Sequence, residues 1–197
     1  MKKLKYFIVL TIALCMVFAS SIVTYAADPY LSYGSKTGSV NVEKYSDKYN
    51  DTWVSILNNG ISAWNNSKAN VSISKASSSK NSIEAAQYDD TWYGLTTQTY
   101  NTSTGYTSKF VIKVNARTIS ADATNFDNFA KSTVTHEFGH VFWLCDNPST
   151  SKSSIMKYSR DRNTMTTPQT FDIDNVNAKY GGWWYEKKSI YIGRYII

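Results

Sequence analysis

The sequence predicts a single α+β domain, and three observations support this prediction. Apolar residues recur at helical spacing in "DTWVSILNNGISAWNN" (51–66), and they alternate at strand spacing in "SKFVIKVNA" (108–116). A second helix is expected from near Asp127 to about Leu144, because Pro148 disfavours helical backbone at the residue before it. The chain therefore combines helices with strands in one domain.

The elements follow in chain order. The helix at 51–66 is expected to begin with Asp51 as its cap and to bury one face, made up of Trp53, Ile56, Leu57, Ile61 and Trp64. The serine-rich stretch 74–82 is expected to be an exposed loop. "TWYGLTTQTY" (91–100) is expected to form a strand. The strand at 108–116 should direct three residues to one side, namely Phe110, Ile112 and Val114.

A third helix is expected in "PQTFDIDNVNAKYGG" (168–182), opened by Pro168 or Thr170 and stopped at Gly181. Proline suits the first turn of a helix, and glycine suits the residue after its end. The expected order is therefore helix, strands, long helix and closing helix.

Residues 1–26 have the layout of a secretory signal peptide. Three lysines precede an apolar run that ends in small residues, with the expected cleavage after Ala26 or Ala27. An uncleaved membrane anchor is the alternative, since a bilayer requires roughly 20 apolar residues, but serines and threonines interrupt this run. We therefore expect a secreted, extracellular protein in which residues 27–197 form one domain with an aromatic tail at 182–197.

The remaining part of about 170 residues is long enough for one domain with a sizeable core. Three of the 21 basic residues and none of the 15 acidic residues lie in the signal segment, so the net charge falls from +6 to about +3. This balance is too weak to indicate a nucleic-acid partner. Cys145 is the only cysteine outside the signal segment, so the mature chain has no internal disulfide.

Both histidines of the chain lie in "THEFGH" (135–140). Residues i and i+4 share a helix face, so His136 and His140 can direct two imidazoles at one metal ion. Glu137 lies about 100° around the helix from His136, which suits it to act on a water molecule and not on the metal. The pattern predicts hydrolysis of peptide bonds with one catalytic zinc ion and Glu137 as general base.

A catalytic zinc site usually has three protein ligands, so a third must come from elsewhere. The downstream candidates are Asp146, Asp161, Asp172, Asp174 and Glu186. On a continuing helix Asp146 would lie roughly 120° off the ligand face and about 9 Å further along the axis. Asp146 can bind only if the chain turns back sharply after His140.

The segment "HEFGHVFWLCD" (136–146) resembles the metzincin motif H-E-x-x-H-x-x-G-x-x-H, in the variant of snapalysin-type secreted bacterial peptidases with aspartate as third ligand. The resemblance covers roughly Val40 to Gly181. It implies a metzincin-like zincin domain, similar to matrixins, with a twisted mixed sheet, an active-site helix, a Met-turn and a C-terminal helix. It assigns the third zinc ligand to Asp146, whereas Asp172 or Asp174 in that role would resemble the deuterolysin-type aspzincins.

The resemblance also assigns roles to other residues. In "SSIMKY" (153–158), Met156 resembles the Met-turn methionine that packs beneath the metal, and Tyr158 resembles a tyrosine that stabilises the oxyanion. "FVIKVNA" (110–116) resembles the edge strand along which substrate lies extended. One departure is Trp143, which replaces the glycine that lets the helix turn towards the third ligand in the family. A left-handed conformation there costs a non-glycine residue on the order of 1–2 kcal/mol.

Two further features have a structural and a functional reading. Cys145 could bind zinc, but packing as a small apolar residue under the turn is favoured. The tail at 182–197 could add strands to the domain or present an aromatic binding surface, and the structural role is favoured. The loop around residues 157–170 is expected to shape the specificity pocket.

The sequence therefore predicts a secreted zinc metalloendopeptidase that acts on a protein or peptide substrate. We expect no nucleic-acid partner, no membrane in the mature form and a monomeric chain. Calcium is a further candidate ion that no pattern in the sequence supports. The alternative is a catalytically silent binding or adhesion protein on the same scaffold, against which the intact His136, Glu137 and His140 argue.

Overall fold

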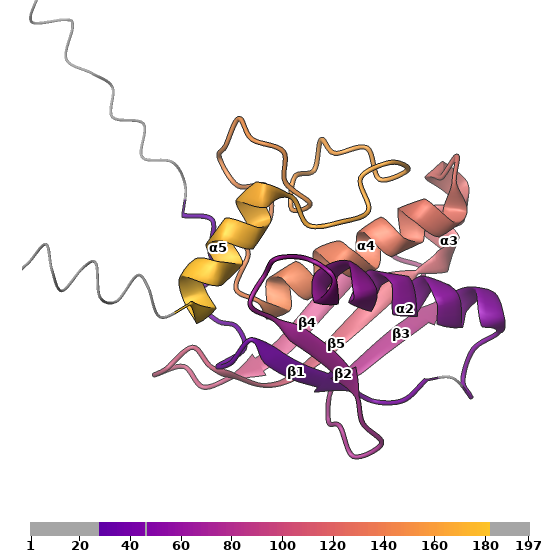
Figure 1. Ribbon diagram of the computed structural model, residues 1–197. Coiled ribbons are helices and arrows are strands. Elements are labelled where there is room, and N and C mark those ends of the chain that lie inside the picture. The colour runs from indigo at the N-terminus through magenta and orange to yellow at the C-terminus, as the bar shows by residue number, and fades with distance from the viewer. Residues whose placement is uncertain (1–27, 46, 182–197) are drawn as a thin grey trace, which may run out of the picture.

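The computed structural model describes residues 28–45 and 47–181, and there the α+β class is confirmed. The predicted signal peptide (1–26) and aromatic tail (182–197) lie outside these residues. No helix in the described ranges is long and apolar enough to cross a membrane. The elements in chain order (Figure 1) are β1 (Ser39–Val42), α2 (Asp51–Asn65), β2 (Ser72–Lys75), β3 (Ser82–Ala86), β4 (Gly94–Tyr100), β5 (Thr107–Asn115), α3 (Ala116–Asp122), α4 (Phe126–Val141) and α5 (Thr170–Tyr180).

The strands form two sheets where a single one was expected. β3, β5 and β4 make a mixed sheet in that order, with β3 parallel and β4 antiparallel to β5, and β1 and β2 form a separate parallel pair. Asn81 links the two sheets. Its backbone oxygen accepts a 2.8 Å bond from the amide of Glu43, and its side-chain oxygen accepts a 2.9 Å bond from the amide of Phe110.

The strand expected at the edge lies in the centre of the mixed sheet. "FVIKVNA" belongs to β5, which pairs on both sides, so its assignment as the edge strand is wrong. The predicted alternation is confirmed, since three residues of β5 are buried together, Phe110, Ile112 and Val114. Alternation identifies the buried face of a strand but not its neighbours in the sheet. Within the described ranges β3 and β4 each pair with β5 alone, so both are edge strands, and β4 is the one that borders the cleft described below.

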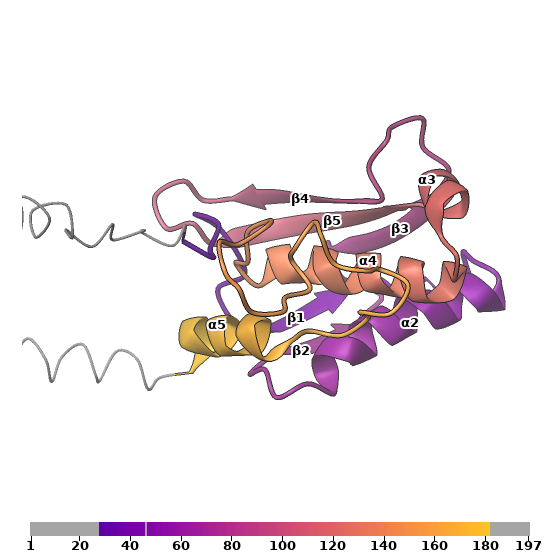
Figure 2. The same ribbon diagram turned by 90° about the horizontal axis from the view of Figure 1, so that it is seen from above.

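Helix α4 packs against β4 and β5, and α2 lies beside α4 (Figure 2). Gly60 of α2 permits a close approach, because a Cβ there would lie 2.2 Å from Cγ1 of Val134 on α4. The indole of Trp64 donates a 2.8 Å hydrogen bond to the backbone oxygen of Thr135. The predicted face of α2 is confirmed: Ile56, Leu57, Ile61 and Trp64 are buried, and Trp53 is partly buried.

Two helix ends differ from the prediction. The cap of α2 is Asn50 and not Asp51, and its side chain accepts a 3.0 Å bond from the amide of Trp53. Asn and Asp cap equally well, so the pattern could not choose between neighbours. α4 ends at Val141 and not near Leu144, because the backbone turns left-handed at Trp143. α5 begins at Thr170 and is followed by a Gly181 cap, as predicted.

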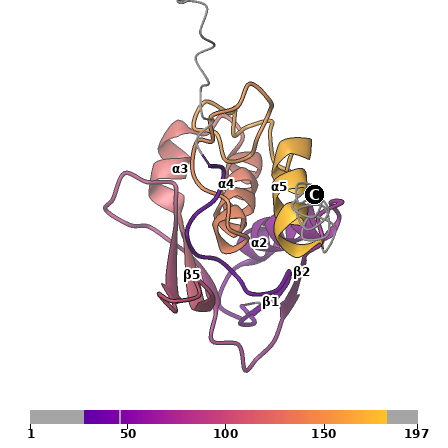
Figure 3. The ribbon, with the colours of Figure 1, turned by 90° about the vertical axis from the view of Figure 1, so that its left-hand side faces the viewer.

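Irregular segments surround the end of α4. The expected serine-rich loop is confined to residues 76–81, since β2 and β3 include its two ends. Residues 28–38 run past α4 towards β1 (Figure 3). They form isolated bridges from Tyr30 to Leu144 and from Gly34 to Tyr106. The N-terminal segment therefore connects the turn after α4 with the turn between β4 and β5.

Candidate active site

A cleft of about 420 Å³ lies between the edge strand β4 and the chain that follows α4. Each of the predicted site residues except Met156 lines this cleft: His136, Glu137, His140, Asp146 and Tyr158. The fold therefore brings residues from α4 and from the loop after it to one place.

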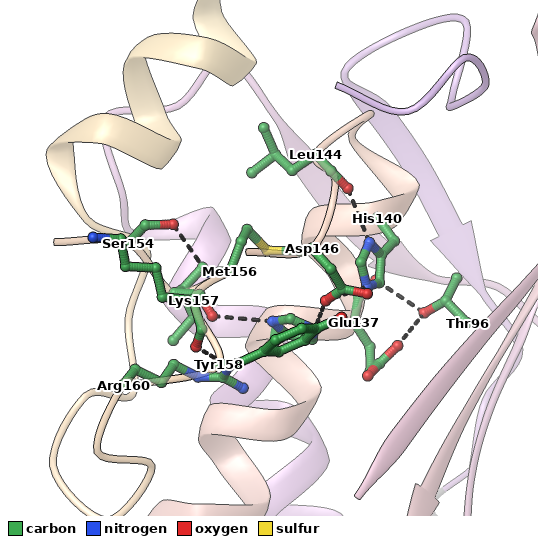
Figure 4. A network of polar contacts seen from close by, with 12 residues as sticks. Thr96, Glu137, His140, Leu144, Asp146, Ser154, Met156, Lys157, Tyr158 and Arg160 are labelled. Carbon is green, nitrogen blue, oxygen red and sulfur yellow. Dashed lines mark hydrogen bonds and ion pairs between the residues drawn. The ribbon is translucent and has the colours of Figure 1, made fainter. Parts of the chain in front are cut away.

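The two histidines lie one turn apart on α4. Nδ1 of His136 is 3.0 Å from the backbone oxygen of Ile155. Nδ1 of His140 is 2.9 Å from the backbone oxygen of Leu144 (Figure 4). A carbonyl oxygen can only accept, so each Nδ1 carries a hydrogen and each Nε2 of a neutral ring presents a lone pair. Burial lowers the pKa of His136, which favours the neutral ring.

Asp146 faces both imidazoles. Its Oδ1 lies 3.1 Å from Nε2 of His136 and 3.6 Å from Nε2 of His140. Partial burial alone would raise the pKa of Asp146, but the nearby imidazoles of His136 and His140 outweigh it and hold that pKa below its ordinary value. Two imidazole nitrogens and a carboxylate oxygen therefore converge on one point.

Trp143 makes the sharp turn that brings Asp146 back to the histidines. Its φ is 75°, in the left-handed region. The metzincin motif that this segment resembles has glycine at the same position. The backbone oxygen of Trp143 accepts a 2.6 Å bond from the amide of Leu31, and its indole donates a 2.8 Å bond to the backbone oxygen of Ser35. These contacts with the N-terminal segment offset a strain on the order of 1–2 kcal/mol.

The edge strand β4 holds the side chain of Glu137. Glu137 is only 4% exposed. The hydroxyl of Thr96 lies 2.7 Å from its Oε2 and can donate a hydrogen bond to it. Gly94 leaves the space it needs, because a Cβ there would lie 2.4 Å from Oε1. One ligand atom each of Glu137, His136 and His140 lie within 4.8 Å of one another. The sequence pattern predicts the strand but not the contributions of Gly94 and Thr96.

Met156 lies beneath the histidine-bearing end of α4. It is 1% exposed, and a Cβ on Gly139 would lie 2.4 Å from its Sδ. Met156 therefore packs against α4 at Gly139, which lies between the two histidines.

The candidate third ligands Asp172 and Asp174 lie elsewhere, and Glu186 lies outside the described residues. Asp172 is buried and accepts bonds of 2.5 Å from the hydroxyl of Ser154 and 2.8 Å from the amide of Ile155. It thereby fixes the turn whose carbonyl at Ile155 orients His136. Asp174 is exposed on α5. Among the described acids, Asp146 is the aspartate that contacts both imidazoles.

Tyr158 and Cys145 flank the site differently. Tyr158 is 58% exposed, and its hydroxyl is hydrogen bonded to the carboxylate of Asp146. Desolvation and the charge of Asp146 raise the pKa of Tyr158, so the phenol keeps its proton. The thiol of Cys145 instead donates a 3.3 Å bond to the backbone oxygen of Asp28, which agrees with a packing role.

Arg160 is a cleft residue that sequence analysis missed. It is only 8% exposed, and it reaches from the loop after Met156 towards α4, where its Nε lies 3.3 Å from the hydroxyl of Ser132 (Figure 4). No spacing or motif marks this arginine in the sequence. Its place depends on how the loop folds back over α4.

Comparisons with known proteins support the fold only. No protein-family model matches this chain, and no curated protein matches its sequence. A chain of the GM1-bound form of the ECX AB5 holotoxin is similar in structure, with a TM-score of 0.51 and 14% identity over 78% of this chain and 85% of that chain. High choriolytic enzyme 1, a hatching enzyme zinc-protease from the medaka fish Oryzias latipes, has a TM-score of 0.47 and 13% identity over 77% of this chain and 96% of its own. The second similarity is too weak to assign a fold or a function, and the first shows a shared fold without a family.

Proposed function

We propose that the chain is a secreted zinc metalloendopeptidase of metzincin type. The observation that carries this proposal is the convergence of Oδ1 of Asp146 with Nε2 of His136 and of His140, while both Nδ1 atoms donate to backbone oxygens. Three acceptors so close together repel one another unless a cation lies between them. Two imidazoles and a carboxylate suit zinc at a catalytic site.

The roles of the neighbouring residues follow from their positions. Zinc bound by this set would polarise the carbonyl of a peptide bond and make a water molecule more acidic. Glu137, held by Thr96, accepts the proton of the attacking water and passes it to the leaving amine. Tyr158, at the mouth of the cleft, donates a hydrogen bond to the oxyanion, a role worth about 2–4 kcal/mol where such donors have been removed.

The shape of the cleft supports an extended peptide as substrate. β4 forms one wall, and its outer edge carries backbone groups that another strand can pair with. Met156 would be the Met-turn methionine of a matrixin-like or snapalysin-like domain. We further propose that the mature chain acts outside the cell as a monomer, on proteins or peptides, without nucleic acid or membrane.

The alternatives have less support in the described residues. A silent binding protein would not need a buried Glu137 held beside two oriented imidazoles. An aspzincin-like site would need an aspartate from α5, but Asp172 is engaged by Ser154 and Ile155. The likeness to a holotoxin chain is one of fold and supplies no binding role.

The proposal is tested by metal analysis of the purified mature chain together with digestion of casein and gelatin. We expect about one zinc per chain, cleavage that stops with a chelator, and recovery when zinc is restored. A chain without zinc, or cleavage that persists in excess chelator, would contradict it.

A further inference from the structure

The end of the cleft beside Gly94 is basic. Arg160 and Arg162 line the cleft there, together with Tyr93 and Thr133. The opposite end is lined by Leu31, Tyr33 and Gln98, none of which is charged. The two ends of the cleft therefore differ in charge, and His136, Glu137 and His140 lie between them.

Arg160 is a buried cation without a carboxylate partner. Two of its donors are used: Nε bonds the hydroxyl of Ser132, and Nη1 donates a 2.9 Å bond to the backbone oxygen of Lys157. Among residues 28–45 and 47–181 its Nη2 forms no hydrogen bond, and no carboxylate there forms a salt bridge with Arg160. Every fully buried side-chain nitrogen or oxygen of the described residues has a hydrogen-bond partner, so Nη2 is not fully buried, and Arg160 lines the cleft.

The burial of this guanidinium has an energetic consequence. Desolvation, followed by repulsion from Arg162, lowers the pKa of Arg160 to about 9. Glu137, Asp146 and Asp172 attract the cation, but none of these described carboxylates forms a salt bridge with it. A buried charge that lacks a counter-ion is unfavourable, and an anion in the cleft would relieve that cost.

Arg162 is held beside Arg160 by aromatic rings. Its guanidinium carbon lies 5.0 Å from the ring centre of Tyr93 and 5.8 Å from that of Phe129, and Nη1 lies 3.3 Å from the backbone oxygen of Tyr158. No salt bridge restrains it among the residues that the structure describes. A planar guanidinium fixed in this way is suited to bind a carboxylate through two parallel hydrogen bonds.

The direction of β4 indicates which substrate residue reaches the basic end. β4 runs from Gly94, beside Glu137, to Tyr100. Antiparallel pairing is slightly more stable per residue than parallel pairing. A peptide that adds antiparallel to the outer edge of β4 has its C-terminal part near Gly94, so the residue after the cleaved bond lies towards Arg160 and Arg162.

We propose that these two arginines bind an acidic side chain on the substrate residue that follows the cleaved bond. The inference rests on the proposed peptidase function and adds a substrate class to it. The pocket selects glutamate or aspartate over their amides, because only the carboxylate supplies the missing negative charge.

The test uses matched peptides with Glu, Gln, Lys or Leu on either side of one cleavable bond. Wild-type protein is expected to show a kcat/KM roughly 10- to 100-fold higher for Glu than for Gln after the bond, as for a charge-assisted pair. Arg162→Met should remove most of this preference, and Arg162→Glu should favour Lys over Glu. Lys80→Met removes an equal charge from an exposed loop and should keep the wild-type preference.

Arg162 is partly exposed, so its variants decide the question even if Arg160→Met does not fold. Cleavage with equal rates for Glu and Gln, or a preference that survives Arg162→Glu, would overturn the inference and leave the peptidase function intact. Failure to cut any peptide would instead contradict the function. In that case calorimetry with Glu137→Gln protein still decides: tighter binding of the Glu peptide than of the Gln peptide supports the pocket, and equal affinities refute it.

Discussion

Trp143 and Tyr180 donate hydrogen bonds to the same backbone oxygen, that of Ser35, over 2.8 and 2.9 Å. Trp143 belongs to the turn that positions Asp146, Tyr180 ends α5, and Ser35 lies in the N-terminal segment. The ammonium of Lys179 lies 4.7 Å from the ring centre of Trp143. Three distant parts of the chain therefore hold the left-handed turn that carries the proposed third ligand.

Gly34→Ala should disturb this turn. A Cβ at position 34 would lie 2.6 Å from Cγ of Trp143, so either the indole or the N-terminal segment must shift. We expect the free energy of unfolding of the metal-free protein to fall by about 1–3 kcal/mol, as for overpacked cores, and zinc affinity to fall as Asp146 moves. Urea unfolding and zinc titration measure both. Exposed Ser32→Ala is the control, and unchanged zinc affinity in Gly34→Ala would show that the indole does not position Asp146.

Tyr180 should make stability depend on alkaline pH. Burial raises its pKa above the ordinary value of 10.0. As the pH rises, the phenol therefore ionises in the unfolded chain before it does in the folded chain. The contribution of Tyr180 to stability is complete below pH 10 and is lost as the pH rises towards the folded pKa. Over this range the free energy of unfolding falls by up to about 1.4 kcal/mol per pH unit. Denaturant unfolding between pH 8 and pH 11 should show a shallower fall for Tyr180→Phe than for wild type. The same slope in Tyr180→Phe and in the exposed control Tyr106→Phe would refute this.

Thr96→Val should slow the reaction without removing the metal. The variant keeps the shape of residue 96 and deletes the hydroxyl 2.7 Å from Oε2 of Glu137, so the carboxylate loses a positioning contact. We expect kcat to fall roughly 10-fold, about the value of one hydrogen bond to a charged group, with zinc content and KM close to wild type. Exposed Thr97→Val on the same strand is the control. Equal rates for the two variants would mean that Thr96 does not position Glu137.

Asp146→Asn and Asp172→Asn should fail in different ways. The first removes a charged ligand and should lose most bound zinc, while folding of the metal-free chain is retained. The second disrupts buried bonds to Ser154 and Ile155, so we expect a loss of about 1–3 kcal/mol in unfolding free energy with zinc still bound. Metal analysis and urea unfolding separate the two effects. Loss of zinc in Asp172→Asn alone would assign the third ligand to α5.

Local patterns in the sequence predicted α2, α4 and α5, the strands β4 and β5 and the pair of histidines, but they did not predict the short helix α3. These features depend on spacing within one segment, as with the four buried residues of α2 and the alternation in β5. The requirement for a sharp turn after His140 also followed from helix geometry. The left-handed Trp143 and the contact of Asp146 with both histidines satisfy that requirement.

Features that depend on contacts between distant segments could not be predicted. The order of strands placed β4 at the edge, although β5 has the stronger pattern. Thr96 and Gly94 matter because β4 passes beside Glu137, and Arg160 matters because a loop folds back over α4. No local property of these residues distinguishes them from other threonines, glycines or arginines in the chain.

The role of Glu137 is the most direct test of the proposed function. Glu137→Gln keeps the shape of the side chain and removes the base, while the proposed zinc ligands remain unchanged. Bound zinc and peptide cleavage should be measured together on this variant and on wild type. We predict zinc content and folding near wild type with turnover lower by roughly 10²–10⁴, the usual contribution of a positioned acid–base group; cleavage as fast as that of wild type would contradict the proposed mechanism.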